Sequence, residues 1–401
     1  MRVRIIDADR VLTGTGELHS PGTVITTDDR IAWVGATEAQ LSDWRGHRVE
    51  RIRLRESTIL PGLIDAHVHL AFGCAVHPRP AIQHDTRLAV AATIRRALRE
   101  LAAAGITTVR DLGAPRYVDS DTLATTTPPT RVLKATIPLT IPGGHCYSLG
   151  GAVTTDSEIA RLVAANAARG AEWIKVMVTG GFTVSGTSSP YEPQFSDHQL
   201  RVIVAAARDH GLPIAAHAHG ITGIRQAVDV GVDSIEHCTW MTDDGGFDFD
   251  LGLVNAIATQ QIMVCPTINH EAMTARGRLP WAVRREQLTV MLGAGVRLVP
   301  GTDSGIPRTP HNKYAHSLPT YLDLGLTPAE VIDLATRRAA QALRIDHSTG
   351  TLTAGLSADL IAVPGDPRQD LTVLATPILA ITAGHLHYPA AVPTTEEYTR
   401  R

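Results

Sequence analysis

The stretch LPGLIDAHVHL, residues 60–70, carries polar side chains at every second position of an otherwise apolar run. Residues two apart in a strand lie on the same face, so Asp65, His67 and His69 are expected to point the same way. The pattern predicts a buried strand whose two histidines face a common interior. Asp65, one layer deeper, is predicted to orient a ligand or to close a buried hydrogen bond.

This strand is the first of a series in which strands and helices alternate over residues 58–347. A helix is expected over residues 86–104, and capping signals at Thr155, Ser196 and Thr327 mark further helix starts. Repeated β–α units predict an α/β fold, a (β/α)8 TIM barrel, while strand counting alone leaves a doubly wound sheet open. The eight candidate strands are LIDAHVHL, ITTVRDLG, RVLKATIPL, WIKVMVTGG, PIAAHAHG, VDSIEHC, IMVCPT and VRLVPGTDSG.

The two ends of the chain read differently from the middle. Residues 1–56 contain short strands separated by Gly, Pro and Asp, and the segment from residue 350 onward has the same character. We therefore predict two domains. Residues 1–56 and 350–401 pair into a small composite β-sandwich, and residues 57–349 form the barrel.

The bulk composition narrows the class of protein. The chain has 401 residues, 44% of them apolar and 19% charged, which is a globular balance. A formal charge of −3 gives no basic footprint for nucleic acid. The start is no signal peptide, no apolar run is long enough to span a bilayer, and the four cysteines form no C-x-x-C pair. We expect a cytoplasmic protein with a small-molecule substrate; a homo-oligomer is left open.

Metal-competent side chains recur near the C-terminal ends of the predicted strands, where TIM barrels gather their catalytic groups. Each has an ordinary explanation: core histidines, an ion-paired lysine, an aspartate in a turn. Their concurrence on five strands favours a metal centre. Besides His67 and His69, the candidates are Lys175, His217, His219, His237 and Asp303.

These motifs resemble the metal-dependent amidohydrolase superfamily over nearly the whole chain. The phrases PGGH (142–145), FSDHQL, HAHG, DSIEHC and GTDSG are most similar to its imidazolonepropionase-like and prolidase-like branch. The resemblance implies a binuclear centre. In that subtype CO2 carboxylates the fourth-strand lysine, here Lys175, and the resulting carbamate bridges two divalent metal ions.

The resemblance also implies the distribution of ligands. His67, His69 and Asp303 would hold the more buried ion, His217 and His237 the outer ion, and Lys175 both. Oxygen and nitrogen donors favour Zn2+, with Mn2+, Fe2+ and Co2+ still open. A bridging hydroxide would attack the scissile carbonyl, and Asp303 would carry its proton to the leaving amine.

Substrate contacts are predicted from position alone. His145 follows two glycines after the third strand and is expected to stabilise the oxyanion. His219 shares a face with His217 and is expected to touch substrate, and Tyr191 lies in a loop long enough to form a lid. Arg308 and Lys313 could bind a substrate carboxylate. For Tyr191, Arg308 and Lys313 the pattern favours simple exposure over a substrate contact.

The predicted activity is hydrolysis of an amide bond in a dipeptide or N-acyl amino acid. A cyclic-amide hydrolase or deaminase is the main alternative, and a lactonase or phosphotriesterase is another. Deaminases of this superfamily usually lack the lysine ligand, so Lys175 argues against them. A catalytically inactive barrel that serves as a binding module is the alternative outside enzymes, although all six expected ligands are present.

Overall fold

The computed structural model describes residues 2–36, 44, 48–74, 82, 85–182 and 189–387. Parts of three predicted segments therefore lie outside the described residues. They are positions 37–43 and 45–47 of the N-terminal segment, the end of the C-terminal segment from Tyr388, and residues 183–188 of the predicted lid loop.

The centre of the molecule is built from parallel strands that neighbour one another in chain order. One sheet has the order β10-β9-β8 and the other the order β11-β12-β13-β14-β15. Single parallel bridges join them at both edges, from Val68 to Ser304 and from Leu139 to Val176. Among the described strands there is no reversal of order of the kind that a doubly wound sheet requires. The bounds are β8 Leu63–Val68, β9 Ile106–Asp111, β10 Arg131–Lys134, β11 Ile174–Met177, β12 Ile214–Gly220, β13 Ser234–Met241, β14 Met263–Cys265 and β15 Arg297–Leu298.

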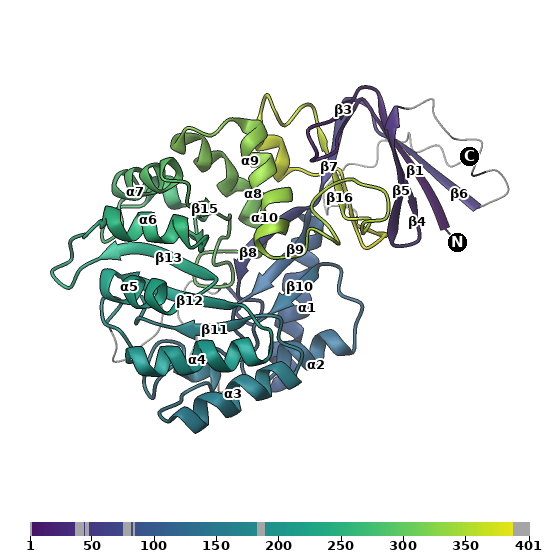
Figure 1. The fold of residues 1–401 in the computed structure, drawn as a ribbon. Coiled ribbons are helices and arrows are strands. Elements are labelled where there is room, and N and C mark those ends of the chain that lie inside the picture. The colour runs from purple at the N-terminus through teal and green to yellow at the C-terminus, as the bar shows by residue number, and fades with distance from the viewer. Residues whose placement is uncertain are drawn as a thin grey trace.

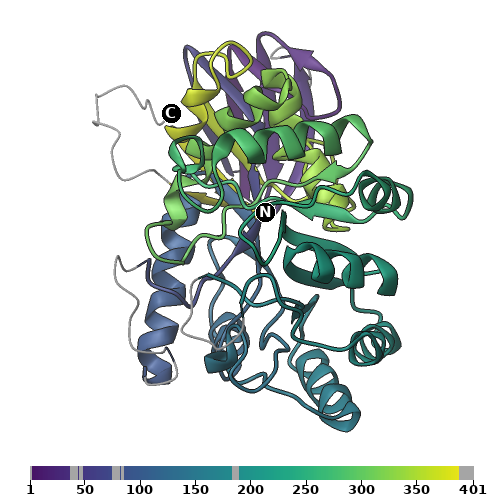
Figure 2. The same cartoon turned by 90° about the vertical axis from the view of Figure 1, so that its left-hand side faces the viewer.

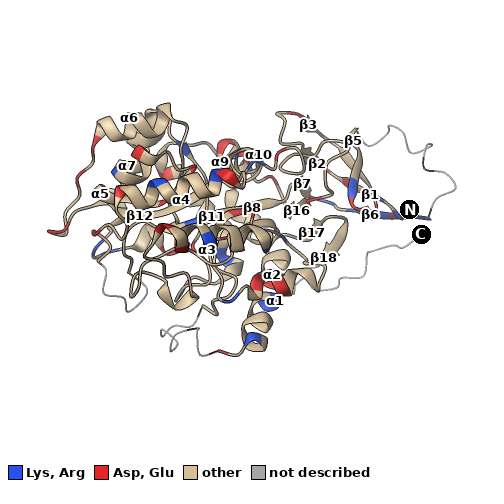
Figure 3. Ribbon diagram, turned by 60° about the horizontal axis from the view of Figure 1, so that its bottom comes forward, with Lys and Arg blue, Asp and Glu red and all other residues tan. Residues whose placement is uncertain are grey.

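Helices alternate with these strands and lie outside them (Figure 1). Of the described helices, none is long and apolar enough to cross a membrane. Charged residues of both signs are spread over the helices and the terminal strands (Figure 3). The α-helices are α1 Arg87–Ala103, α2 Val118–Ala124, α3 Asp156–Ala168, α4 Asp197–Asp209, α5 Ile221–Val230, α6 Leu251–Thr259, α7 Trp281–Gly293, α8 Tyr314–Ser317, α9 Pro328–Leu334 and α10 Arg337–Ala342. Short 3-10 helices span Tyr147–Leu149, Ala272–Thr274, His311–Lys313, Leu318–Leu324 and Leu371–Ala375.

The predicted helix starts are confirmed. Thr155, Ser196 and Thr327 each form a capping box, in which the hydroxyl accepts a backbone N–H and the side chain three residues later reaches back. Thr86 caps α1 in the same way through its hydroxyl. The helix ends at Ala103, and Gly105 follows its C-cap with a φ of +79°, a left-handed conformation that glycine adopts without strain.

The terminal segments pair into two mixed sheets, as expected. The four-stranded sheet, with the order β5-β4-β1-β6, contains N-terminal strands only, whereas the six-stranded sheet, with the order β18-β17-β16-β7-β2-β3, places strands from both ends side by side. Figure 1 shows them together to one side of the α/β part, and the turned view agrees (Figure 2). The strands are β1 Arg2–Ala8, β2 Arg10–Leu12, β3 Leu18–His19, β4 Gly22–Thr27, β5 Arg30–Ala36, β6 Arg48–Arg53, β7 Ser57–Pro61, β16 Leu360–Pro364, β17 Leu379–Thr382 and β18 His385–His387.

Buried apolar side chains stabilise both the terminal sheets and the α/β part. Ile6 and Val24 of the first terminal sheet share a buried cluster with Leu360 and Ile381 of the second. A larger cluster joins the parallel strands to the helices around them. Each fully buried Leu, Ile or Val contributes about 1.5–3 kcal/mol, so this packing holds the strands while polar residues occupy their ends. The division of the chain into domains at residues 56/57 and 349/350 stays a prediction; β7 pairs with β2 and β16 in the six-stranded sheet.

Candidate metal centre

All six predicted ligands line one cavity of about 700 Å³. They come from β8, β11, β12 and β13 and from the segment after β15, that is, from strands far apart in the sequence. His145 and His219 line the same cavity. The six ligands are His67, His69, Lys175, His217, His237 and Asp303.

The first cluster consists of His67, His69 and Asp303. The Nε2 atoms of the two imidazoles lie 3.4 Å and 3.1 Å from Asp303 Oδ1. The segment with Asp303 runs beside the first strand because the Asp303 N–H donates to the carbonyl of His67 at 2.8 Å. Ligand atoms of these three residues lie within 4.8 Å of one another, so they could hold one metal ion.

Asp65 lies below this cluster and closes hydrogen bonds, one of its two predicted roles. Its carboxylate accepts the Thr302 hydroxyl at 2.6 Å and the Thr302 N–H at 3.1 Å. Burial raises the pKa of Asp65 to about 7, although these bonds act in the opposite direction. Asp65 therefore ties β8 to the segment that carries Asp303.

Lys175 reaches the same cavity from β11. It is fully buried, and its flanking residues Ile174 and Val176 belong to the main apolar core. Its Nζ forms no hydrogen bond with any described residue. Burial lowers the pKa of Lys175, and the nearby carboxylates of Glu236 and Asp303 offset this only in part. A buried ammonium without a hydrogen-bond partner is costly, so the site favours a chemical form of Lys175 other than a free cation.

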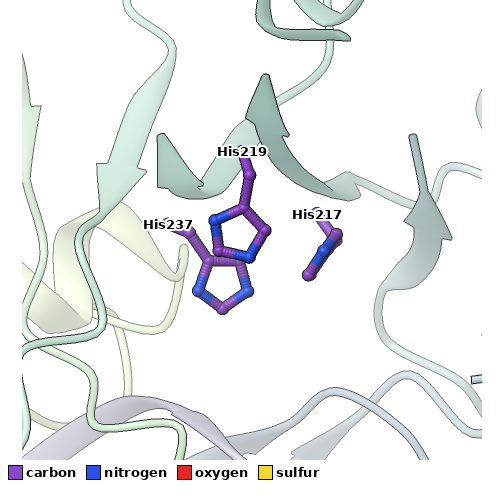
Figure 4. Close-up of side chains that lie close together, drawn as sticks. All are labelled: His217, His219 and His237. Carbon is purple, nitrogen blue, oxygen red and sulfur yellow. The ribbon is translucent and has the colours of Figure 1, made fainter. Parts of the chain in front are cut away.

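The second cluster is made of His217, His219 and His237, whose rings converge from β12 and β13 (Figure 4). The centroid of the His237 ring lies 4.5 Å from the centroids of both His217 and His219. Ligand atoms of the three lie within 4.8 Å of one another. His219, predicted as a substrate contact, therefore also lies within reach of a metal ion that His217 and His237 would hold.

Hydrogen bonds orient these three rings. His217 Nε2 donates to the Gly180 carbonyl at 2.9 Å. His219 Nδ1 lies 3.1 Å from the hydroxyl of Thr239, and His237 Nδ1 lies 2.9 Å from the hydroxyl of Thr267. Each imidazole thus uses one nitrogen for orientation and keeps the other for a ligand, the usual arrangement of metal-binding histidines. Of these partners, Gly180 lies in the loop after β11, Thr239 in β13 and Thr267 in the loop after β14.

The electrostatics of the cavity keep most of its imidazoles neutral. Burial lowers the pKa of His217 and His237 well below the ordinary value, and neighbouring imidazoles add to the effect. Burial likewise lowers the pKa of His219 to about 3 and of His145 to about 4. Burial opposes ionisation of Asp303, but the electrostatic effect of the adjacent His67 and His69 outweighs it, so the pKa of Asp303 lies well below the ordinary value. Neutral imidazoles and an ionised carboxylate are the forms that bind metals.

The backbone is strained where two ligands sit. His237 has a φ of 67° and Asp303 a φ of 60°, left-handed conformations that cost energy outside glycine. Arg284 from α7 is buried and donates to the carbonyls of His237 and Cys238, the second at 2.6 Å. The guanidinium thereby holds the middle of β13 in the conformation that turns His237 into the cavity.

Only some of the predicted substrate contacts line the cavity. His145 is buried beside His217, with ring centroids 4.5 Å apart. Its backbone N–H donates to Gln194 Oε1 at 2.6 Å. Arg308 lines the cavity but pairs with Glu271 at 3.2 Å. Tyr191 and Lys313 are not among the described residues that line it, so their substrate contacts stay predictions. The aromatic side chains of Phe182 and Trp281 also line the cavity.

Sequence reasoning missed Glu236, Arg110 and Arg284. Glu236 stands directly before His237, and strict alternation would place the two side chains on opposite faces of the strand. The left-handed backbone at His237 breaks that alternation, so both reach the interior. Arg284 looks like an ordinary charged residue of a helix until the packing of α7 against β13 is known.

The donor set fits divalent metal ions. His67 Nε2, Lys175 Nζ and Asp303 Oδ1 are buried and form no hydrogen bond with described residues, although all three groups are strongly polar. Buried polar atoms are normally satisfied, so such a convergence requires a partner. Two clusters, His67/His69/Asp303 and His217/His219/His237, are each able to hold an ion.

Comparisons with known proteins agree with this geometry. A family model described as "Amidohydrolase family" matches residues 58–386. The chain is 27% identical to ochratoxinase of Aspergillus niger over 442 aligned positions, covering 94% of the chain and 84% of the relative. It is 27% identical to imidazolonepropionase of Streptomyces coelicolor, covering 85% and 86%. The crystal structure of a Xaa-Pro dipeptidase with bound methionine in the active site superposes with a TM-score of 0.82 at 26% identity, covering 96% of this chain and all of that one (100%).

Proposed function

Because the chain belongs to the amidohydrolase family and is an enzyme that acts on carbon–nitrogen bonds, we propose that it hydrolyses the amide bond of a dipeptide or N-acyl amino acid. The observation that carries the proposal is the convergence of the six predicted ligands on one cavity. The likeness to a Xaa-Pro dipeptidase and to ochratoxinase supports this substrate class.

The proposed frame is a closed (β/α)8 barrel. The parallel bridges at both edges of the two sheets support closure, since they connect the first strand to the segment after β15 and the segment after β10 to β11. Backbone hydrogen bonds support closure further. The His69 N–H donates to the backbone carbonyl of Ser304 at 2.7 Å, and the Leu139 N–H donates to the backbone carbonyl of Lys175 at 2.8 Å. A closed ring would gather the C-terminal ends of all eight strands, including the five that lead to ligands, around one mouth.

We propose a binuclear centre with Zn2+ as the favoured metal. His67, His69 and Asp303 would hold one ion, His217 and His237 the other, and a CO2-derived carbamate on Lys175 would contact both. Such ions act as Lewis acids on a scissile carbonyl and lower the pKa of water, which allows hydrolysis at neutral pH. Carboxylation would replace a buried ammonium with an anion and thereby remove the desolvation problem at Lys175.

Two side chains of the cavity are proposed as catalytic. Asp303, ionised and adjacent to both first-strand imidazoles, would take a proton from the attacking water and deliver it to the leaving amine. His145, held through its backbone by Gln194, would donate a hydrogen bond to the oxygen that gains charge. Gly181 makes room for that ring, because a Cβ there would lie 2.4 Å from His145 Cε1.

The mouth of the cavity supports an anionic substrate. Arg276, Arg278 and Arg308 line it, and of these Arg308 is already paired with Glu271. The guanidinium of Arg278 lies over the ring of Phe182, with its carbon 5.8 Å from the ring centroid. Phe182 in turn makes an edge contact with His219, at 4.8 Å between centroids. Arg278 is thus the cation we propose for a substrate carboxylate, in place of Arg308.

A cyclic-amide hydrolase or deaminase is the second candidate, favoured by the likeness to imidazolonepropionase. Both candidates are tested by incubating metal-loaded protein with dipeptides, N-acyl amino acids and cyclic amides and measuring released amine and ammonia. The proposal predicts release of a free amino acid from the first two groups. Ammonia release alone would contradict it and support deamination, and ring opening without either product would support the cyclic-amide reading.

The carbamate has a separate test. The chain contains only three lysines, Lys134, Lys175 and Lys313, so a carbamate carbon is readily assigned. Metal-loaded protein equilibrated with 13C-bicarbonate is expected to show one carbamate resonance by NMR. The resonance should persist in Lys134→Arg and Lys313→Arg and vanish in Lys175→Met. Its absence from the wild type would contradict the bridging role.

A further inference from the structure

A buried row of charges lies behind the first metal cluster. Glu236 Oε2 is 2.7 Å from His67 Nδ1, and Glu236 Oε1 is 2.8 Å from Arg110 Nη2. All three side chains are buried, with at most 1% of each exposed. Charges so deep in a protein are stabilising only when they are paired and hydrogen-bonded, which this row achieves from β8, β9 and β13.

Arg110 is itself held rigidly. Its Nε donates to the carbonyl of Ala66, the residue before His67, at 2.7 Å. Its guanidinium carbon lies 4.4 Å from the ring centroid of Trp173, two residues before Lys175. The arginine therefore connects the strand that carries His67 with the strand that carries Lys175, and its Nη2 fixes one oxygen of the Glu236 carboxylate.

The row determines which nitrogen of His67 carries hydrogen. An ionised carboxylate only accepts hydrogen bonds, so His67 Nδ1 must donate to Glu236. In the neutral imidazole, which is the form that binds metals, the lone pair is then on Nε2, the atom that lies 3.4 Å from Asp303 Oδ1 and forms no hydrogen bond with a described residue. This is the tautomer that can bind a metal ion on the cavity side.

We propose that Glu236, fixed by Arg110, is a positioning residue that sets the tautomer and orientation of His67 for metal binding. The inference rests on the proposed metal centre and adds a residue that acts through a ligand. Carboxylate partners of this kind typically change metal affinity about 10- to 100-fold when removed.

A competing arrangement is a separate metal site made by His67, Glu236 and Cys265, whose ligand atoms also lie within 4.8 Å of one another. Two contacts oppose it. His67 Nδ1 is already used by Glu236, and the Arg110 guanidinium on the same carboxylate would repel a cation. The positioning role predicts that removing the thiol of Cys265 leaves the metal count unchanged.

The decisive variant is Glu236→Gln. Arg110 offers only donors, so the amide oxygen of the glutamine must face Arg110 and its NH2 must face His67. His67 Nδ1 then becomes the acceptor, and hydrogen moves to Nε2, the metal-binding atom. Asp359→Asn is the matched control, because Asp359 is also buried and paired with an arginine, Arg131 at 3.3 Å, but stands directly before β16 and does not line the cavity.

The experiment is a chelator competition for Zn2+ with metal-free wild type, E236Q, D359N and C265A, with circular dichroism to verify folding. We expect two ions in every variant except E236Q, in which one ion binds about 10- to 100-fold more weakly. Unchanged Zn2+ affinity in E236Q would overturn the positioning role of Glu236 but leave the proposed metal centre intact. Three ions in the wild type that fall to two in both E236Q and C265A would replace it with the separate site. A wild type that binds no metal would overturn the metal centre as well.

A measurement on the wild type covers the case in which E236Q does not fold. Imidazole 15N–1H correlation spectra of the zinc-loaded protein, with His67 assigned by a His67→Asn variant, report the tautomer directly. Hydrogen on Nδ1 of His67 is expected. Hydrogen on Nε2 would contradict the role of Glu236 whatever the metal content.

Discussion

Replacing Lys175 with methionine should stabilise the metal-free protein but destabilise the metal-loaded protein. In metal-free protein the lysine is buried, forms no hydrogen bond with described residues and has its pKa lowered by burial. Methionine has a similar length, fills the space and carries no charge. The variant should therefore be more stable than the wild type without metal, and less stable with metal, because it cannot supply the bridging carbamate.

The magnitude follows from the missing partner. An unsatisfied buried polar group costs about 1–3 kcal/mol, and more when charged. Glu236 and Asp303 attract the ammonium but do not restore its pKa, so a net penalty remains. We expect Lys175→Met to gain about 1–3 kcal/mol in metal-free protein. With metal the wild type should gain by mass action, about 2.7 kcal/mol at a free metal concentration 100 times the dissociation constant.

The assay is thermal unfolding followed by tryptophan fluorescence, with and without Zn2+. Lys134→Met is the control, since Lys134 lies on β10 and does not line the cavity. The unfolding midpoint of Lys175→Met should lie above that of the wild type without metal and below it with metal. The midpoint of Lys134→Met should respond to metal as the wild type does. A metal-free Lys175→Met that unfolds below the wild type would refute the expected cost of burying Lys175.

Three further changes test other parts of the site and the fold. Asp303→Asn should retain much of the metal but lose about 10²- to 10⁴-fold in turnover, as expected for a lost proton carrier, and near-normal turnover at full metal content would exclude the role. Arg278→Gln should raise KM for carboxylate-bearing substrates about tenfold or more and leave their C-terminal amides unaffected, with Arg308→Gln as the weaker control; equal effects on acids and amides would argue against a carboxylate contact. Burial raises the pKa of Asp119 to about 6, above the unfolded value of 3.8, so its ionisation costs stability as pH rises through roughly 4–6 and the full cost, about 3 kcal/mol, applies above pH 6. Asp119→Asn should therefore gain stability over wild type at pH 7.5 and lose that advantage near pH 4, as measured by unfolding midpoints across pH; a difference that does not vary with pH would contradict it.

The sequence predicted those parts of the structure that depend on local pattern. The alternation of LIDAHVHL, the capping boxes at Thr155 and Ser196 and the glycine after α1 all follow from neighbouring residues, and all are confirmed. The terminal strands were likewise visible in the turns between them. What joined the two ends into mixed sheets was the pairing of β16 with β7, which strand periodicity makes plausible without fixing its register.

The parts that depend on three-dimensional contact were not predictable in the same way. Arg284 acts on the middle of β13 only because α7 packs there, and Glu236 reaches His67 across a separation of 169 residues. Arg308 could bind a substrate carboxylate as far as the sequence shows, and only the structure reveals that Glu271 lies beside it. Such assignments need coordinates, because a charged residue has the same appearance in the sequence whether it is exposed, paired or aimed at a site.

The most direct test of the central claim is a crystal structure of the zinc-loaded protein with an anomalous difference map at the zinc edge. The account predicts two peaks in the cavity, one among His67, His69 and Asp303 and one against His217 and His237, with density for a carboxylate on Lys175 between them. It would be contradicted by a single peak, by ions located elsewhere, or by a Lys175 side chain that ends at Nζ and touches neither ion.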